Sequence, residues 1–137
     1  YAGIFVALSL VVIGNNKGII TNWDRTTYAV ELCDYFNTLD IDSVFFVNDP
    51  DTSIICKGID QNHKYGAYMS ESQSLYLSIC SYNQSTQGSF YGDKNIIAVI
   101  TGNNLTDLIP SEIATQYTYI DTVRWYDLYI AEQVLFP

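Results

Sequence analysis

Two nearly continuous apolar runs along the chain predict buried strands. Residues 4–13 form the first run, which only Ser9 interrupts, and residues 95–100 form the second. Unbroken runs of this kind are typical of strands in parallel sheets, which are buried on both faces. The first run is too short to span a bilayer, which takes about 20 apolar residues. A signal-peptide core is the other interpretation of that run, but no basic segment precedes it.

Shorter patterns complete the predicted order of elements. Apolar positions at helical spacing predict helices, and short apolar runs rich in β-branched and aromatic residues predict strands. The predicted elements are a helix over 25–39, strands over 43–47, 53–59 and 75–80, and a closing helix over about 122–134, with loops over 14–24 and 60–66 and a turn over 48–51.

This order predicts a single α/β domain, residues 1–137, on an open and mostly parallel sheet. No repeat, low-complexity tract or linker divides the chain. In open sheets of this kind the functional site lies beyond the carboxyl ends of the strands. The start at Tyr1, without a methionine, indicates a processed or trimmed chain, which leaves open that this is a fragment of a longer one.

The charge balance excludes several classes of partner. The chain has 15 acidic and 6 basic residues, which give a formal net charge of -9 at pH 7. Nucleic acid needs clusters of Lys and Arg, and so does an anionic membrane surface. We therefore expect no nucleic-acid partner. Hydrophobic residues make up 48% of the chain, so a folded core is expected rather than disorder.

The cysteines and the N-glycosylation triplets do not by themselves indicate a fold or a function. Cys33, Cys56 and Cys80 are too few for a disulfide framework and lack the spacing of zinc ligands. Asn83 and Asn104 begin triplets that accept N-glycans in a secretory compartment. The chain carries no phosphate loop, nucleotide fingerprint or His-Glu metal motif, so we expect no cofactor and no metal. A Rossmann-like small-molecule sensor therefore ranks last among the possible functions.

Three residues are candidates for chemistry. Cys80 ends an apolar strand and precedes a polar stretch, which suits an exposed thiolate nucleophile. His63 is the only histidine and hence the only imidazole that could activate a thiol. Asn22 lies in the predicted loop before the first helix, where it could orient the imidazole. The plainer alternatives are a buried thiol, a solvated histidine and a helix-capping asparagine.

The order of residues around Cys80 resembles a known family. Residues 80–86, the pair Phe90-Tyr91 and residues 95–99 resemble the legumain-like cysteine peptidases, and within them the transamidase that attaches glycosylphosphatidylinositol anchors. Residues 22–25 and the helix that leads into the strand at 43–47 resemble the first loop, helix and second strand of the same family. The resemblance implies a three-layer caspase-like fold.

The resemblance also implies roles for individual residues. Cys80 corresponds to the nucleophile that forms a thioester, and Asn22 to the asparagine that supports the catalytic histidine. His63 would move the proton, and the backbone near Gly66 would hold the oxyanion. Cys56 falls near a cysteine that forms a disulfide with another subunit.

The activity implied is acyl transfer from the C-terminal peptide of a protein precursor to the amine of a lipid anchor. Other protein subunits are expected as partners. The expected compartment is the endoplasmic reticulum lumen or the secretory pathway, with tethering to the membrane by a segment outside this chain as one alternative. Ser78-Ile79 replace the Asp-Thr that precedes the family's nucleophile, and Lys64-Tyr65 separate His63 from Gly66. The altered residues before Cys80, together with the short separation of His63 from Cys80 along the chain, favour the rival hypothesis, a non-catalytic caspase-like subunit or interaction module with a decayed site.

Overall fold

The computed structural model describes residues 17–77 and 93–135, and it has the predicted α/β class. The strand expected at residues 4–13 lies outside the described residues, as do Cys80 and Asn83. The described elements are α2 (Lys17–Phe36), β1 (Ser43–Val47), α3 (Pro50–Ile59), β2 (Lys64–Met69), β3 (Ser74–Leu77), β4 (Lys94–Thr101), α5 (Leu105–Leu108), α6 (Ser111–Ala114), β5 (Thr118–Val123) and β6 (Tyr126–Gln133).

The strands form one mixed sheet in the order β3-β2-β1-β4-β6-β5. The central strand β1 is parallel to both of its neighbours, β2 and β4. The three outer pairings, β2 with β3, β4 with β6 and β5 with β6, are antiparallel. The predicted strands at 43–47 and 95–100 are confirmed as β1 and β4, the two strands at the centre of the sheet.

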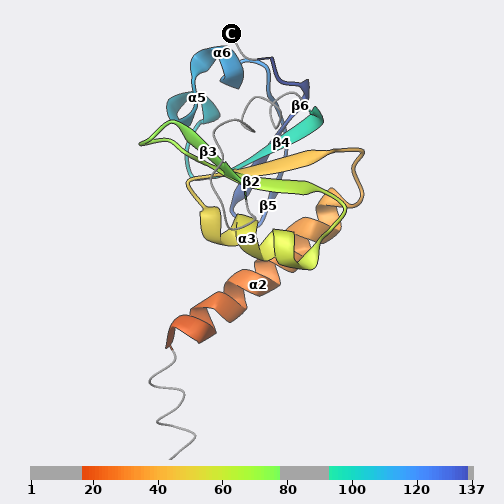
Figure 1. Ribbon diagram of the computed structural model, residues 1–137, viewed down its shortest axis with the longest axis vertical. Helices are drawn as coiled ribbons and strands as arrows, with labels where there is room; N and C mark the ends of the chain where they lie inside the picture. Colours follow the sequence, from red (N-terminus) through yellow and green to blue (C-terminus); the bar gives the residue numbers. More distant parts are fainter. Residues whose placement is uncertain (1–16, 78–92, 136–137) are drawn as a thin grey trace, which may run out of the picture.

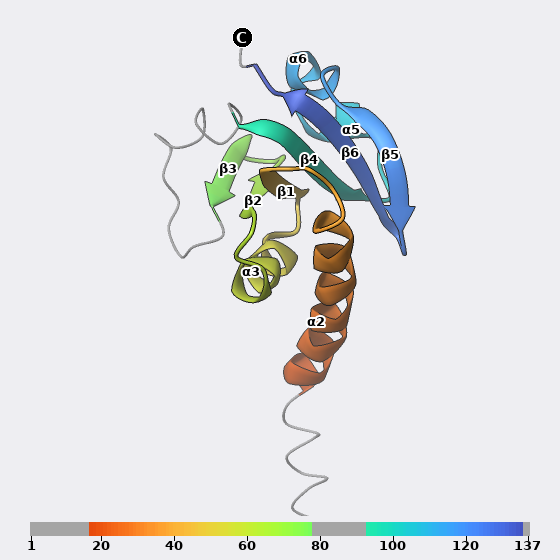
Figure 2. The ribbon, with the colours of Figure 1, turned by 90° about the vertical axis from the view of Figure 1, so that its right-hand side faces the viewer.

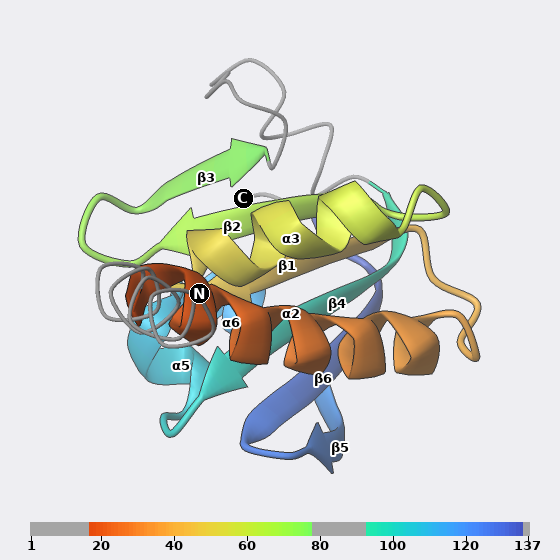
Figure 3. The ribbon, with the colours of Figure 1, turned by 90° about the horizontal axis from the view of Figure 1, so that it is seen from below.

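Helices cover both faces of the sheet, which gives three layers (Figures 1 and 2). Alternate side chains of β1 point to opposite faces, as the pleat of a strand requires. Val44 and Phe46 pack under α2 and α3, whereas Phe45 and Val47 pack with α5 and α6. Seen from below, α2 and α3 lie side by side on one face of the sheet and run roughly along β1 and β2 (Figure 3).

Helix α2 confirms the predicted first helix but begins earlier than expected. Its buried positions are Ala29, Leu32, Cys33 and Phe36, which recur at helical spacing. The structure starts this helix at Lys17, so the prediction of a loop over 14–24 was wrong for residues 17–24. Polar residues and a single glycine weaken a helix without ending it. No helix in the described ranges is long and apolar enough to cross a bilayer.

The prediction of a strand over 53–59 was wrong, because this segment is part of α3. Asp49 caps the helix: its Oδ1 accepts a hydrogen bond from the Thr52 amide at 3.2 Å and its Oδ2 accepts one from the Thr52 hydroxyl at 2.6 Å. Pro50 occupies the first helical turn, where its missing N–H costs nothing. These start signals outweigh the β-branched residues that follow.

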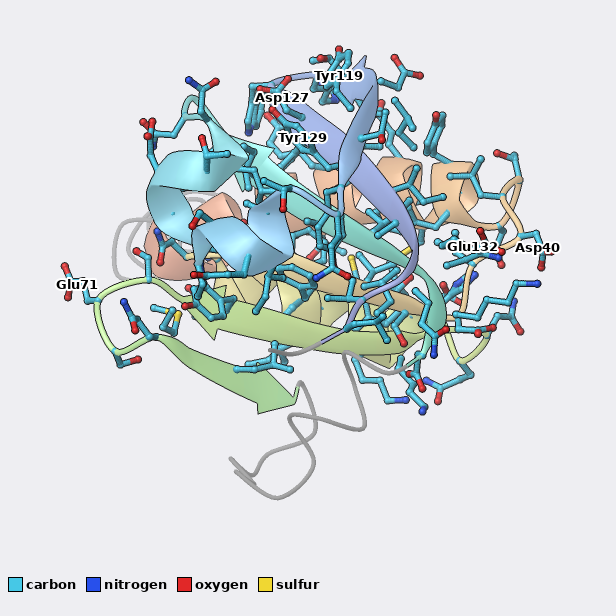
Figure 4. All side chains as sticks on the ribbon, turned by 90° about the horizontal axis from the view of Figure 1, so that it is seen from above. Asp40, Glu71, Tyr119, Asp127, Tyr129 and Glu132 are labelled. Atoms are coloured by element: carbon cyan, nitrogen blue, oxygen red, sulfur yellow. The ribbon has the colours of Figure 1, made fainter. Side chains whose placement is uncertain are left out.

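The predicted closing helix over 122–134 was also wrong, because β5 and β6 form a hairpin there. Arg124 turns the chain with φ of 55°, and Val123 pairs with Tyr126 across the turn. In β6, Tyr126 and Leu128 are buried at a spacing of two, the period of a strand. Tyr119 and Tyr129 pack edge to face across the hairpin, with ring centroids 5.7 Å apart (Figure 4).

Candidate functional site

His63 immediately precedes β2 and lies at the amino edge of the parallel strands. The expectation that all candidate residues lie beyond carboxyl ends of strands was therefore wrong for His63. The imidazole is also buried, with 7% of the residue exposed, rather than solvated in a polar loop.

The imidazole of His63 is bonded to a buried carboxylate. Its Nδ1 lies 2.7 Å from Oδ2 of Asp60, and the Tyr65 hydroxyl donates to the same oxygen at 2.5 Å. The backbone N–H of Asn62 donates to the other oxygen of Asp60, Oδ1, at 2.8 Å. Burial by itself raises the pKa of Asp60, but the hydrogen bonds from Tyr65 and His63 outweigh it and lower that pKa below its ordinary value.

An ionised Asp60 fixes the proton of the imidazole. A carboxylate only accepts hydrogen bonds, so the proton between the two groups lies on Nδ1 of His63. In the neutral ring Nε2 is then unprotonated and free to act as a base. This is the arrangement in which a carboxylate orients a histidine for proton transfer.

A polar cavity of about 360 Å³ lies beside this pair and is partly lined by His63 itself. Lys64 and Asp93 close one side with an ion pair of 3.0 Å, and Ser43 donates to the same Asp93 oxygen at 2.6 Å. The lining residues are Asp42, Lys57, Gln61, Asn62, His63, Lys64 and Asp93.

The described end of β3 reaches the same edge of the sheet. Because β3 is antiparallel to β2, Leu77 is paired with Gly66, near the amino end of β2. Gly66 is buried within β2 between β1 and β3, and the predicted loop over 60–66 gives way to this strand at Lys64.

The other candidate residues belong to different elements from His63. Asn22 is in the early part of α2, so the predicted loop position was wrong, and about 20 Å of helix separates it from Phe36 at the end nearest the amino edge. Cys56 is fully buried in α3, so a bond to another subunit requires the helix to move away from its neighbours. Asn104 is exposed where α5 begins, so it is accessible to modification.

A second cavity, of about 500 Å³, lies at the opposite, carboxyl edge of β1 and β4. The chain order reverses between these two strands, since β1 leads to β2 on one side while β4 lies on the other. Open α/β sheets bind ligands at such switch points. The lining residues are Asp24, Arg25, Tyr28, Asn48, Asp49, Thr101, Trp125 and Tyr126.

The walls of this carboxyl-edge cavity combine aromatic rings with carboxylates. Tyr28 and Trp125 meet edge to face at 4.5 Å, and Trp125 is 49% exposed. Arg25 is already paired with Asp51 at 2.9 Å, which leaves the exposed carboxylate of Asp24 available. Aromatic faces beside carboxylates suit an organic cation.

Asp60 and Tyr65 were missed by reasoning from the sequence alone. The available signal was an acidic residue three positions before the only histidine, with a tyrosine two positions after it. Among the residues that the structure describes, no group of three His, Cys, Asp or Glu side chains is placed to hold a metal ion. Comparisons of the chain with protein-family models, with curated proteins and with solved structures found no match.

Proposed function

We propose that the chain is a legumain-like, caspase-fold domain that carries out acyl transfer on protein C-termini, with Cys80 as nucleophile and His63 as base. The observation that carries the proposal is the hydrogen bond between His63 and the ionised Asp60 beside a polar cavity. In this proposal Asp60 takes the orienting role that the family resemblance assigns to Asn22.

The strand pairing supports a role for Cys80. The described part of β3 ends at Leu77, at the edge of the sheet that carries His63. Only Ser78 and Ile79 stand between Leu77 and Cys80 in the sequence. An extended chain advances at most about 3.6 Å per residue, so the covalent chain holds the α-carbon of Cys80 within about 11 Å of the α-carbon of Leu77.

The proposed reaction uses the imidazole of His63 and the thiol of Cys80. Nε2 of His63 takes the thiol proton, and the thiolate of Cys80 attacks the carbonyl carbon of the scissile peptide bond. The imidazolium, stabilised by Asp60, gives its proton to the departing amine, and a thioester remains on Cys80. An amine then attacks the thioester and restores the thiol, so the peptide bond is exchanged for a new amide.

The family resemblance supplies the substrate class, a precursor C-terminus as donor and the amine of a lipid anchor as acceptor, together with further protein subunits and the endoplasmic reticulum lumen as the compartment. The exposed Asn104, a possible N-glycan acceptor, is compatible with a secretory location.

The test is the pH dependence of Cys80 alkylation by iodoacetamide, followed by peptide mapping. An unperturbed thiol has a pKa of about 8.5, so a thiol activated by His63 reacts at its full rate at lower pH. We expect His63→Gln to return the profile of Cys80 to that of an ordinary thiol. Asn62→Ala is the matched control, because its side chain bonds Asn37 rather than Asp60. Identical profiles in the wild type and His63→Gln would overturn the proposal.

The carboxyl-edge cavity favours a second candidate, a non-catalytic module that binds a basic side chain of a partner protein. Asp24 and Asp49 line the cavity together with a single cation, Arg25. The neighbouring Arg124 already lies over the ring of Tyr28, 4.6 Å from its centroid, so the half-exposed indole of Trp125 is the aromatic surface proposed for the incoming cation.

Binding of N-acetyl-lysine methylamide, followed by the NMR signal of the Trp125 indole, tests this candidate. The uncharged norleucine analogue is the ligand control, and Trp125→Phe assigns the signal. We expect Asp24→Asn to weaken binding about threefold or more, whereas Asp107→Asn on α5 leaves it unchanged. Equal shifts with both ligands, or none, would rule out this candidate.

A further inference from the structure

Two of the three cysteines face each other across the contact between α2 and α3. Cys33 lies on α2 and is 5% exposed, and Cys56 lies on α3 and is fully buried. Both belong to the same apolar cluster beneath the two helices. Both thiols are free in this structure.

Hydrogen-bond geometry brings the sulfur of Cys56 close to Cys33. The Cys56 Sγ lies 4.0 Å from the carbonyl oxygen of Ala29. In an α-helix that carbonyl accepts the backbone N–H of the residue four positions later, which is Cys33. Residues four apart also share one face of the helix, so the Cys33 side chain points toward the same neighbour.

The two thiols also act on each other directly. The hydrogen bond with Cys33, together with burial, raises the pKa of the Cys56 thiol. The Sγ of Cys33 lies 3.5 Å from the Tyr65 hydroxyl oxygen, whose proton is donated to Asp60. The thiol of Cys33 therefore has only weak hydrogen bonds to give up if it is oxidised.

We propose that Cys33 and Cys56 form an intramolecular disulfide that joins α2 to α3 when the chain folds in an oxidising environment. The oxidant is a small-molecule disulfide such as oxidised glutathione. One cysteine thiolate attacks it and releases one reduced glutathione, and the second thiolate then displaces the other. The two cysteines lose two protons and two electrons, which the two glutathione thiols carry away.

This pairing assigns Cys56 an internal partner instead of one on another subunit. The bond would close the loop from Cys33 to Cys56, which contains the end of α2, all of β1 and the first part of α3. Closing such a loop restricts the unfolded chain and thereby stabilises the folded one. The proposed disulfide does not depend on Cys80 or on the proposed catalytic function.

Refolding in a buffer of reduced and oxidised glutathione tests the proposal, because the thiols are accessible before the helices pack. Digestion without reduction, followed by mass spectrometry, is expected to yield one linked pair of peptides that contain Cys33 and Cys56. Cys80→Ser is the control and keeps the same linked pair. The oxidised protein is expected to melt about 10 °C above the same protein after reduction.

A free Cys33 and Cys56 after refolding, or a bond from either one to glutathione, to Cys80 or to a second chain, would overturn the proposal. Loss of Cys80 reactivity in the alkylation experiment would leave this result unchanged, so failures of the two proposals are distinguishable.

Discussion

The Nδ1 atom of His63 lies 2.7 Å from Oδ2 of Asp60, and both side chains are buried at the amino edge of the sheet. Asp60 is the C-cap residue of α3 and His63 precedes β2, so the short connection between the helix and the strand builds the pair. A buried carboxylate without partners is costly, and here the imidazole, the Tyr65 hydroxyl and a backbone amide compensate it. The pair is therefore a feature of the fold and also the chemical centre of the proposed site.

Asp60 should make folding stability depend on acid pH. Its folded-state pKa is lowered, whereas the unfolded pKa is about 3.9. Stability from this group is therefore present above about pH 4 and is lost as the pH falls through the folded-state pKa. We expect the free energy of unfolding, measured with urea, to decrease below pH 4 in the wild type.

Asp60→Asn should remove this part of the pH dependence. At pH 7 the variant is expected to be about 2 kcal/mol less stable, because an amide replaces a charged acceptor that serves several donors. Asp107→Asn, an exposed position on α5, is the control and should retain the wild-type pH profile. An unchanged acid profile in Asp60→Asn would contradict the assigned role.

Two buried tyrosines in β2 should respond in opposite ways to loss of the hydroxyl. Tyr65 donates to Asp60 at 2.5 Å, so Tyr65→Phe is expected to cost about 1–2 kcal/mol. The hydroxyl of Tyr68 is buried without a hydrogen-bond partner in the described structure, so Tyr68→Phe is expected to be neutral or stabilising by up to about 1 kcal/mol.

Urea unfolding of both variants at pH 7 makes the comparison. The two substitutions are identical in size and lie in the same strand, so any general effect of removing a hydroxyl cancels. Equal destabilisation by both would show that the bond to Asp60 contributes nothing.

The centre of the sheet could be predicted because its sequence pattern is unambiguous. Residues 44–47 and 96–100 are apolar on both faces, and short runs of this kind that are rich in β-branched and aromatic residues favour a buried strand. The apolar positions in residues 122–134 fit both the period of a helix and the period of a strand. Which of the two forms therefore depends on pairing with other parts of the chain. There the turn at Arg124 and the register with β4 select the strand.

The candidate site was predicted only in part for a related reason. His63 was identifiable as the only histidine, but its partner Asp60 depends on where α3 ends. With residues 53–59 interpreted as a strand, nothing brings the carboxylate and the imidazole together. The end of a helix followed by a tight connection places them within hydrogen-bond distance.

The N-cap of α3 offers a local test of the helix that replaced the predicted strand. Asp49 accepts two hydrogen bonds from Thr52, and Asp49→Ala is expected to destabilise the protein by about 1 kcal/mol. Asp51→Ala is the matched control, because it removes an exposed carboxylate from the same first turn, together with its ion pair to Arg25, but leaves the cap in place, and should cost less than about 0.5 kcal/mol. Equal losses in urea unfolding would contradict capping by Asp49.

One substitution distinguishes the hairpin from the helix that the sequence suggested. The hydroxyl of Thr122 donates to Oδ1 of Asp127 across the β5–β6 pair at 2.8 Å. Thr122→Ala removes this bond and a β-branched residue, so we expect a loss of about 0.5–1 kcal/mol. In a helix the same change would be stabilising, because alanine has the highest helix propensity. Val30→Ala is the control, because Val30 is a β-branched, 43% exposed residue in the interior of α2, and this change should be neutral or stabilising in the same urea experiment. A gain of stability in Thr122→Ala would contradict the hairpin.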